Sequence, residues 1–496
     1  MMDHDLIVIG GGAAGLGAVR SALWAGADVA MVTDSAPGGD CTFTGCVPSK
    51  TLLAAARDGL DFNEARARVR STIDHIAATE SADVLRGEGA TVIEGRARLV
   101  THDTVAVGER RITAPRIVLA TGSRPSLPDI RGLADARPLT NETVFDLTEA
   151  PESLGIIGGG PTGCELAQAF ALLGVEVTLF ESQNQLLLGE EPEAAGLVRE
   201  ALQGLDVTVR RKAHVERIET ATGADGGSGG PFSVLCDRKP GEVVERLLVA
   251  TGRTPATAGL GLEEMRFKLG EWTGHVLTDE RLETSVKGVY AAGDVAAWRE
   301  RRPYRSPRRP LPLFKESGRS SSVLHAARRQ KHFATLNLSH AADEMGRIAA
   351  GNALGKGLRG RFRGDLVPRV VFTDPEVASV GLTPSQAPPG SRVAYLPLTE
   401  VDRAITDGRT DGFIAIVAGP RRLLRNAGGG RVLGATIVAP RAGEMIQEIV
   451  LAMRTGAFAG RLAQVSHAYP TWSGGVQKAA AQFFGEIEGR QARNVA

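Results

Sequence analysis

A short apolar run, a glycine-rich turn and an alanine-rich stretch follow one another at the start of the chain. The run Leu6–Ile9 predicts a buried parallel strand, and residues 16–25 predict a helix. Gly26 ends that helix, and the apolar run 28–32 predicts a second strand. The pattern is typical of a strand–helix–strand unit with the sequence GGGAAG in its first turn.

The same pattern recurs in the middle of the chain. An apolar run at 154–157 leads into GGGPTG, a helix is predicted over 164–173, and a strand over 175–181. In such units the glycines let the backbone approach a pyrophosphate, which rests on the helix N-terminus. The sequence therefore predicts two dinucleotide sites, and their glycines are Gly10, Gly12, Gly15, Gly158, Gly160 and Gly163.

The residue that ends the second strand differs between the two copies. An acid there binds the ribose hydroxyls of adenosine. The second copy has Glu181, and residues 182–185 after it include no arginine for a 2′-phosphate, so we expect NADH rather than NADPH. The first copy has Thr33 at this position, and the neighbouring Asp34 is expected to substitute as the ribose ligand.

Two of the four cysteines in 496 residues, Cys41 and Cys46, lie in the short segment GGDCTFTGCVPSK. A close pair can cycle between dithiol and disulfide. A structural disulfide is disfavoured because closing so short a loop removes little chain entropy. A zinc site would need two more ligands, and the sequence offers no second CxxC or nearby cysteine–histidine pair. We therefore interpret the pair as redox-active.

Composition excludes several other functions. The chain is 43% hydrophobic with a formal net charge of +1, which implies no general affinity for nucleic acid or membranes. It has no apolar stretch of about 18 residues, so no membrane span is expected. Its start lacks a basic region before the first apolar run, so we expect no signal peptide and a cytoplasmic location. A cysteine pair there is catalytic more often than structural.

The cysteine segment and four later motifs together resemble the motifs of a known family. The later motifs are ATGSRP at 120–125, ATGR at 250–253, YAAGDV at 290–295 and RVVFTDPE at 369–376. With these, the chain resembles the flavoprotein pyridine nucleotide-disulfide oxidoreductases, which include dihydrolipoyl dehydrogenase, glutathione reductase and mercuric reductase.

The resemblance implies an α/β fold with two Rossmann-like dinucleotide-binding domains and a C-terminal α+β dimerisation domain, assembled as a homodimer. The implied ranges are 1–150 and 279–367 for the FAD-binding domain, 151–278 for the NAD-binding domain and 368–496 for the dimerisation domain. A basic insertion rich in arginine and proline, at about 298–332, interrupts the second FAD-binding range. We expect it to be a solvated loop, with a docking site for an acidic partner or anionic substrate as the alternative.

The resemblance also implies roles for single residues. Electrons would pass from NADH through FAD to the Cys41–Cys46 disulfide, and then to a small-molecule acceptor. Cys41 would attack the substrate, and Cys46 would lie against the flavin. Lys50 would lie near flavin N5, paired with Glu165 on the second nucleotide-binding helix. The remaining cofactor contacts implied by the motifs are Thr121, Gly122, Gly252 and Asp294.

The chain departs from the family at its proton-handling histidine. Disulfide reductases carry His-Pro-Thr and a nearby glutamate, whereas this chain has Tyr469 and Gly474 at those positions. Tyrosine titrates at about pH 10, so it is a poor base at neutral pH. His467 lies two residues earlier, and in an extended segment it would share a face with Tyr469. It is a candidate substitute acid or base, and a structural role is the alternative.

These departures leave the electron acceptor open. One hypothesis is a disulfide of the dihydrolipoyl type. The other is a metal ion or a quinone, since Tyr469 resembles the tyrosine of mercuric reductases. Yet the chain lacks the C-terminal cysteine pair that mercuric reductases usually carry. Pro161 stands where many members have an aromatic residue over the flavin, which would open the flavin to quinones.

Overall fold

The computed structural model describes residues 2–220, 231–237, 241–299, 333–356, 360–421 and 425–495. The expected basic insertion at about 298–332 lies outside the described residues except for Trp298 and Arg299. In the part of the chain that is described, no helix is long and apolar enough to cross a membrane.

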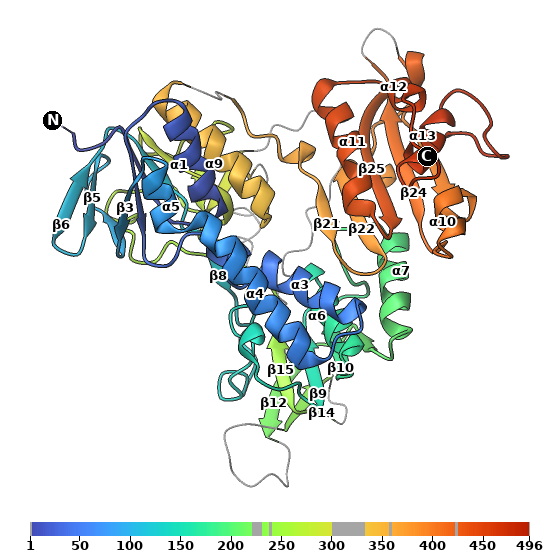
Figure 1. Ribbon diagram of the computed structural model, residues 1–496, viewed down its shortest axis with the longest axis horizontal. Coiled ribbons are helices and arrows are strands. Elements are labelled where there is room, and N and C mark those ends of the chain that lie inside the picture. The colour runs from blue at the N-terminus through green and yellow to red at the C-terminus, as the bar shows by residue number, and fades with distance from the viewer. Residues whose placement is uncertain are drawn as a thin grey trace, which may run out of the picture.

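The first nucleotide motif belongs to a parallel five-stranded sheet. Its strands, in spatial order, are β18 (Val289–Ala291), β7 (Ile117–Leu119), β1 (Leu6–Ile9), β2 (Val29–Thr33) and β3 (Thr91–Glu94). β18 comes from beyond the second nucleotide motif, so two distant parts of the chain build one sheet. Helix α1 (Ala13–Trp24) packs against α9 (Ser339–Leu354), as Figure 1 shows. The packing is close: a Cβ at Gly346 would lie 2.0 Å from the carbonyl oxygen of Ala14.

The second motif forms a four-stranded parallel sheet of its own. Its strands, in spatial order, are β11 (Thr208–Arg211), β10 (Glu176–Glu181), β9 (Ser153–Ile157) and β15 (Arg246–Val249). Helices α6 (Pro161–Leu172) and α7 (Pro192–Gln203) pack against it. Both predicted strand–helix–strand units are thus present. Helices α1 and α6 begin earlier than predicted, directly after Gly12 and Gly160, which take extended N-cap conformations.

The first glycine of each motif is required for the same steric reason. Gly10 has φ of 113° and Gly158 has φ of 114°, in the region that favours glycine. A Cβ at Gly10 would lie 2.2 Å from the carbonyl oxygen of Ala120, and one at Gly158 2.5 Å from that of Ala250. In both copies a neighbouring strand end crosses directly over the turn.

Short strands connect the two sheets. β8 (Ser123–Pro125) and β16 (Arg253–Pro255) pair antiparallel, so the two ATG motifs meet at the crossing. β17 (Val276–Thr278) lies inside the range expected for the NAD-binding domain, yet it pairs with β19 (Ala296–Arg299). Leu260, Leu262 and Val276 pack in the core of the first sheet, so this segment belongs with the first sheet by its packing.

Peripheral strands complete these two parts of the fold. They are β4 (Ala97–Leu99), β5 (Thr104–Val107) and β6 (Arg110–Thr113) in one sheet, β12 (Val215–Thr220), β13 (Phe232–Cys236) and β14 (Glu242–Val244) in a second, and β20 (Phe333–Ala334) beside β19.

The C-terminal part is an antiparallel six-stranded sheet covered by helices, at the right of Figure 1. The strands, in spatial order, are β21 (Arg369–Val371), β22 (Glu376–Gly381), β25 (Arg431–Ala439), β24 (Phe413–Gly419), β23 (Arg392–Pro397) and β26 (Arg493–Asn494). Its helices are α10 (Asp402–Thr406), α11 (Ala442–Thr455), α12 (Ala459–Gln464) and α13 (Gly474–Ala481). This mixed α/β architecture agrees with the expected fold class.

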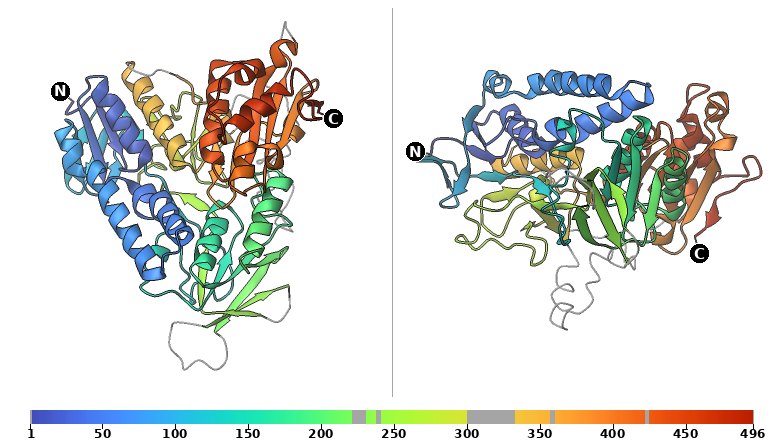
Figure 2. Two further views of the ribbon diagram at one scale, coloured as in Figure 1. Left: turned by 45° about the vertical axis from the view of Figure 1, so that its right-hand side comes forward. Right: turned by 90° about the horizontal axis from the view of Figure 1, so that it is seen from below.

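The helices after β2 connect all three parts. They are α2 (Gly39–Phe43), α3 (Cys46–Arg57), α4 (Phe62–Glu80) and α5 (Ala82–Gly87). α3 lies beside α6 at the centre of the molecule, and α4 packs along α3 (Figures 1 and 2). Leu52 and Leu53 of α3 share a core with Leu166 of α6 and Val371 of β21. The second turn of α3 is therefore held by apolar packing against both neighbouring parts.

Candidate active site

One cavity of about 3030 Å³ runs between the three parts of the fold. Both glycine motifs, the two ATG crossings and the cysteine segment line it, together with the start of α9. Among the residues predicted from sequence, the cavity brings together Gly10, Gly12, Asp34, Cys41, Cys46, Lys50, Thr121, Gly122, Gly158, Gly160, Glu165, Glu181, Gly252 and Asp294. The two remaining glycines, Gly15 and Gly163, lie beneath the turns, where a Cβ would be 1.9 Å from the carbonyl oxygen of Gly10 or Gly158.

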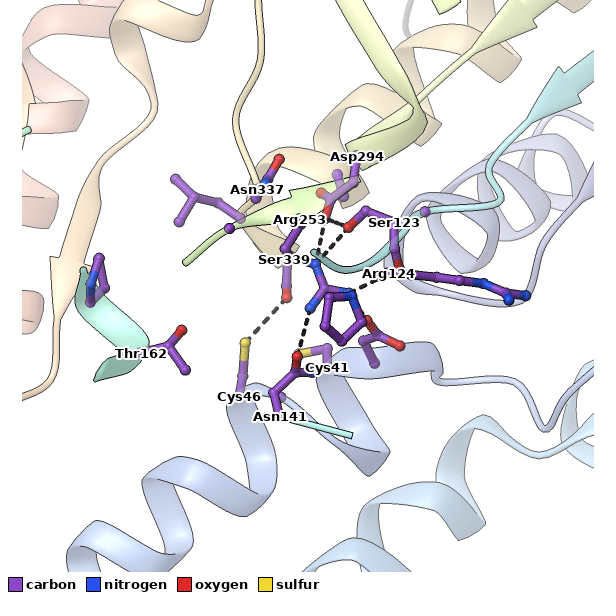
Figure 3. A pocket seen from close by; sticks show the side chains of 18 of the residues that line it. Cys41, Cys46, Ser123, Arg124, Asn141, Thr162, Arg253, Asp294, Asn337 and Ser339 are labelled. Carbon is purple, nitrogen blue, oxygen red and sulfur yellow. Dashed lines mark hydrogen bonds and ion pairs between the residues drawn. The ribbon is translucent and has the colours of Figure 1, made fainter. Parts of the chain in front are cut away.

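The two redox cysteines lie at the wall of this cavity. Cys41 belongs to the short helix α2 and Cys46 is the first residue of α3, and both are free thiols. Cys46 Sγ lies 3.3 Å from Ser339 Oγ. Figure 3 marks this contact with a dashed line. A hydrogen bond with Cys41, then the Ser339 hydroxyl and the Lys50 charge, lowers the pKa of Cys46 to about 6. The same Cys46 contact, with burial, raises the pKa of Cys41.

Lys50 forms an ion pair one turn along α3 from Cys46. Its Nζ lies 2.6 Å from Glu165 Oε2 on α6, and the Glu165 side chain is 5% exposed. The second carboxylate oxygen, Oε1, accepts a hydrogen bond of 2.9 Å from the backbone N–H of Phe372. The Lys50 ammonium also lies 4.9 Å from the centre of the Phe372 ring. The C-terminal part therefore contacts both members of the ion pair.

A second cluster around Arg253 was not predicted from the sequence. Arg253 Nε donates a 2.6 Å hydrogen bond to Ser123 Oγ, which in turn donates a 2.7 Å bond to Asp294 Oδ2. Arg253 also forms an ion pair with Asp40, the residue before the first redox cysteine, and donates to Asn141 Oδ1 (Figure 3). The guanidinium thus connects the cysteine segment to the crossing strands β8 and β16.

The first nucleotide motif has the features that FAD requires. The first turn of α1 carries no acidic side chain, and a Cβ at Gly12 would meet only the Cα of Gly39, 4.0 Å away, so a phosphate can approach the helix N-terminus. Burial raises the pKa of Asp294, and the Ser123 hydrogen bond and the Arg253 charge oppose that rise. Asp34 is exposed at the cavity wall, whereas Thr33 is buried and donates to the carbonyl of Ser35.

Three predicted cofactor residues shape the two ATG crossings through backbone conformation or local hydrogen bonds. Gly122 has φ of 72° and Gly252 has φ of 141°, values that favour glycine at both crossings. The Thr121 hydroxyl donates to the carbonyl of Ala256, so it holds the first crossing against the second.

The second nucleotide motif presents Glu181 at the end of β10. Its Oε2 accepts a 2.9 Å hydrogen bond from the backbone N–H of Gly159, and Oε1 accepts a 2.7 Å bond from that of Gln183. Its register partner on β11 is Arg211, whose guanidinium donates to the carbonyl of Asn184. The sequence after Glu181 gave no sign of this cation, because it comes from the neighbouring strand.

The two candidates for proton handling, His467 and Tyr469, lie on the C-terminal part and do not line the cavity of the same chain. His467 Nε2 lies 3.1 Å from Glu448 Oε2 on α11, and its Nδ1 lies 3.0 Å from the carbonyl oxygen of Val465. Both ring nitrogens therefore already face acceptors. Tyr469 is 81% exposed, and Gly474 begins α13.

Comparisons with known proteins agree with this geometry. Residues 4–329 match the pyridine nucleotide-disulphide oxidoreductase family, and residues 367–480 match its dimerisation domain. The mercuric reductase of Bacillus cereus is 30% identical over 501 residues, which cover 97% of this chain and 72% of that protein. The dihydrolipoyl dehydrogenase of Thermus scotoductus is 33% identical over 511 residues, covering 97% of each.

Solved structures give the same result. LpdA from Mycobacterium tuberculosis superposes with a TM-score of 0.79 at 28% identity, covering 97% of this chain and all of that one. The flavoprotein disulfide reductase RclA from Escherichia coli superposes with a TM-score of 0.77 at 26% identity, covering 96% and 99%. The family uses FAD and takes electrons from NAD(P)H, and the dimerisation domain supports a homodimer. The chain belongs to the pyridine nucleotide-disulphide oxidoreductase family, and it is an FAD-dependent NAD(P)H disulfide oxidoreductase.

Proposed function

We propose that this enzyme uses NADH to reduce a small disulfide of the dihydrolipoyl type at Cys41 and Cys46. The observation that carries the proposal is the placement of both thiols on the wall of the common cavity, with Cys46 one helical turn from Lys50 of the Lys50–Glu165 ion pair. FAD, bound at the first glycine motif, supplies the two-electron relay between nicotinamide and thiols. Lys50 supplies positive charge beside that relay, and Glu165 holds the lysine in place.

The two thiols have different roles in this proposal. Cys41 is the thiol that attacks the acceptor, so it must lose its proton in each cycle. Cys46 carries negative charge at neutral pH, because its pKa is lowered to about 6. In the homodimer we expect the exposed Tyr469 of one subunit to approach the cysteines of the other and to donate a hydrogen bond there. The small number of cysteines favours a reducing compartment such as the cytoplasm.

A soft metal ion is the second candidate acceptor, because the groups that manage protons are altered. His467 has both nitrogens occupied, and Tyr469 replaces the expected base. Two thiols alone bind soft metal ions, and they release their protons on binding. Mercuric reductases are among the relatives, and one RclA structure is a Cu(II) complex. Among the described residues no cluster of three or more His, Cys, Asp or Glu side chains could hold a resident metal, so a metal ion would be substrate.

A screen of acceptors tests the proposal directly. The purified holoenzyme is supplied with NADH and with lipoamide, low-molecular-weight disulfides, quinones, Hg²⁺ or Cu²⁺, and NADH oxidation is followed. We expect kcat/KM to be at least about tenfold higher for a disulfide than for any other acceptor, a difference of about 1.4 kcal/mol. Higher kcat/KM for a metal ion or a quinone would overturn the disulfide assignment.

The nucleotide preference rests on Glu181. A carboxylate accepts hydrogen bonds from both ribose hydroxyls and repels a 2′-phosphate, so we expect kcat/KM to favour NADH over NADPH by at least about tenfold. Glu181→Ala should remove most of this preference. Arg211→Ala is the matched variant, and it should lower turnover with NADPH while leaving KM for NADH unchanged. Wild-type preference for NADPH, abolished by Arg211→Ala, would show that the arginine decides instead.

A further inference from the structure

A buried glutamine fastens the C-terminal part to the second nucleotide-binding helix. Gln168 lies on α6 and is only 2% exposed. Its Nε2 donates a 2.9 Å hydrogen bond to the carbonyl oxygen of Asp374, and its Oε1 accepts a 2.6 Å bond from the backbone N–H of the same residue. A polar side chain this deeply buried must recover its hydrogen bonds from protein groups. One amide thus fixes both backbone groups of a residue that follows β21.

Gln168 acts beside Glu165 on the same face of α6. The two residues are three positions apart, a spacing that makes side chains neighbours on a helix. Glu165 Oε1 accepts the 2.9 Å hydrogen bond from the backbone N–H of Phe372, so α6 holds two residues of the segment 372–374. From α3, Arg57 Nη2 donates a 2.7 Å bond to the carbonyl oxygen of Phe372. The segment is therefore held by its backbone against both helices.

The position of this segment affects Lys50 in two ways. The Phe372 ring lies 4.9 Å from the Lys50 ammonium. The Phe372 N–H also occupies one oxygen of the Glu165 carboxylate, whose other oxygen pairs with that ammonium. A buried carboxylate that loses a hydrogen-bond partner is costly, so a shift of the segment would displace the carboxylate and the lysine with it. Gln168 is not among the described residues that line the cavity, so its effect there must pass through these contacts.

We propose that Gln168 is a positioning residue for Lys50. It fixes Asp374 on α6 and so keeps Phe372 in place. Phe372 in turn keeps the Glu165 carboxylate and the Lys50 ammonium where they are. The inference rests on the proposed function only in placing Lys50 beside the flavin. Positive charge there favours the reduced flavin, so the midpoint potential of the bound flavin reports the position of that charge.

The test measures this midpoint potential in the purified holoenzyme, without any electron acceptor. Gln168→Met keeps the side-chain volume and removes both hydrogen bonds. We expect it to lower the potential by about 30 mV, which corresponds to a tenfold change in the two-electron reduction equilibrium. Lys50→Met should lower the potential at least as much, and Gln168→Met should add no further change in that background. Gln168→Ala is the second variant, and it should lower the potential in the same way as Gln168→Met.

The chain contains a matched control in Gln482. This glutamine is 1% exposed, and its amide makes the same pair of hydrogen bonds, at 3.1 and 3.0 Å, with the backbone N–H and carbonyl of Tyr395. Both residues belong to the C-terminal part. Gln482→Met should therefore lose similar hydrogen bonds without changing the flavin potential.

An unchanged potential in Gln168→Met and Gln168→Ala, with normal flavin content, would overturn the inference. So would a shift that persists in full in the Lys50→Met background, because the glutamine would then act independently of the lysine. A shift that depends on Lys50, in an enzyme that reduces no disulfide, would retain the inference and reject the proposed acceptor. Disulfide reduction by the wild type, together with an unchanged potential in both Gln168 variants, would do the reverse.

Discussion

Cys41→Ser is expected to lower disulfide reduction by at least about 10³-fold, the scale of loss when a catalytic nucleophile is removed. The flavin should remain bound, because Cys41 makes no part of the glycine motif or of the crossing strands. NADH should still reduce the flavin in a single turnover. The measurement compares steady-state disulfide reduction with the rapid bleaching of flavin absorbance by NADH.

Cys46→Ser is the companion variant, and it should lose disulfide reduction to a similar extent. Quinone reduction distinguishes the remaining alternatives, because a quinone can take electrons from the flavin without the thiols. Full retention of disulfide reduction by Cys41→Ser would contradict the assignment of Cys41 as the attacking thiol. A different outcome is possible, in which both variants still reduce quinones and the wild type reduces no disulfide. That outcome would mean that the natural acceptor takes its electrons directly from the flavin.

The second large effect concerns the first glycine of each nucleotide motif. Gly10→Ala should leave less than about a tenth of the wild-type flavin content, a loss of at least ~1.4 kcal/mol in binding. The reason is steric, since the new Cβ would lie 2.2 Å from the carbonyl oxygen of Ala120 and would force the turn apart. Gly158→Ala should keep its flavin and raise KM for NADH at least about tenfold. Its new Cβ would lie 2.5 Å from the carbonyl oxygen of Ala250 and would disturb only the second nucleotide motif.

Flavin absorbance per protein and NADH titration measure the two effects separately. Gly87→Ala is the control for a glycine-to-alanine change, since a Cβ there meets no atom within 4 Å and its φ is not in the left-handed region. It should alter neither flavin content nor KM for NADH. Loss of flavin from Gly158→Ala with normal flavin in Gly10→Ala would mean that the two sites are assigned the wrong way round.

The elements that form the two sheets were predictable because local patterns specify them. Each apolar run is buried on both faces, and each glycine motif fixes a turn whose conformation only glycine tolerates readily. The helix starts were predicted too late, because the glycine motif itself supplies the N-cap of each helix. The redox cysteines were found from their spacing and their glycine-rich surroundings alone.

The residues that surround those cysteines were harder to predict. Ser339 is separated from Cys46 by 293 positions, and no local pattern indicates that the two will meet. Arg253 was part of a recognised motif, but its pairing with Asp40 depends on how two crossing strands align. Arg211 comes to lie beside Glu181 through strand register, which depends on how the strands of the sheet pair and not on either strand alone.

The histidine near the C-terminus shows the same limit. In disulfide reductases the glutamate at the position of Gly474 is the partner of a histidine at the position of Tyr469, and no partner was predicted for His467. The structure supplies Glu448 instead, from α11, which precedes the histidine in the chain. Burial raises the pKa of Glu448, and the contact with His467 opposes that rise. Whether a histidine is free to act as a base was decided by tertiary contacts that the sequence does not display.

In the proposed electron path, the C-terminal part contributes through the backbone N–H of Phe372. It holds the Glu165 carboxylate, which in turn holds the ammonium of Lys50 beside the thiols. A chain cut before residue 368 would keep both glycine motifs and both cysteines but lose this support. If Lys50 acts as proposed, the nucleotide-binding halves therefore depend on the C-terminal part for electron transfer as well as for assembly. A C-terminal domain grafted onto them from another relative would need to present a backbone N–H to Glu165 at this position.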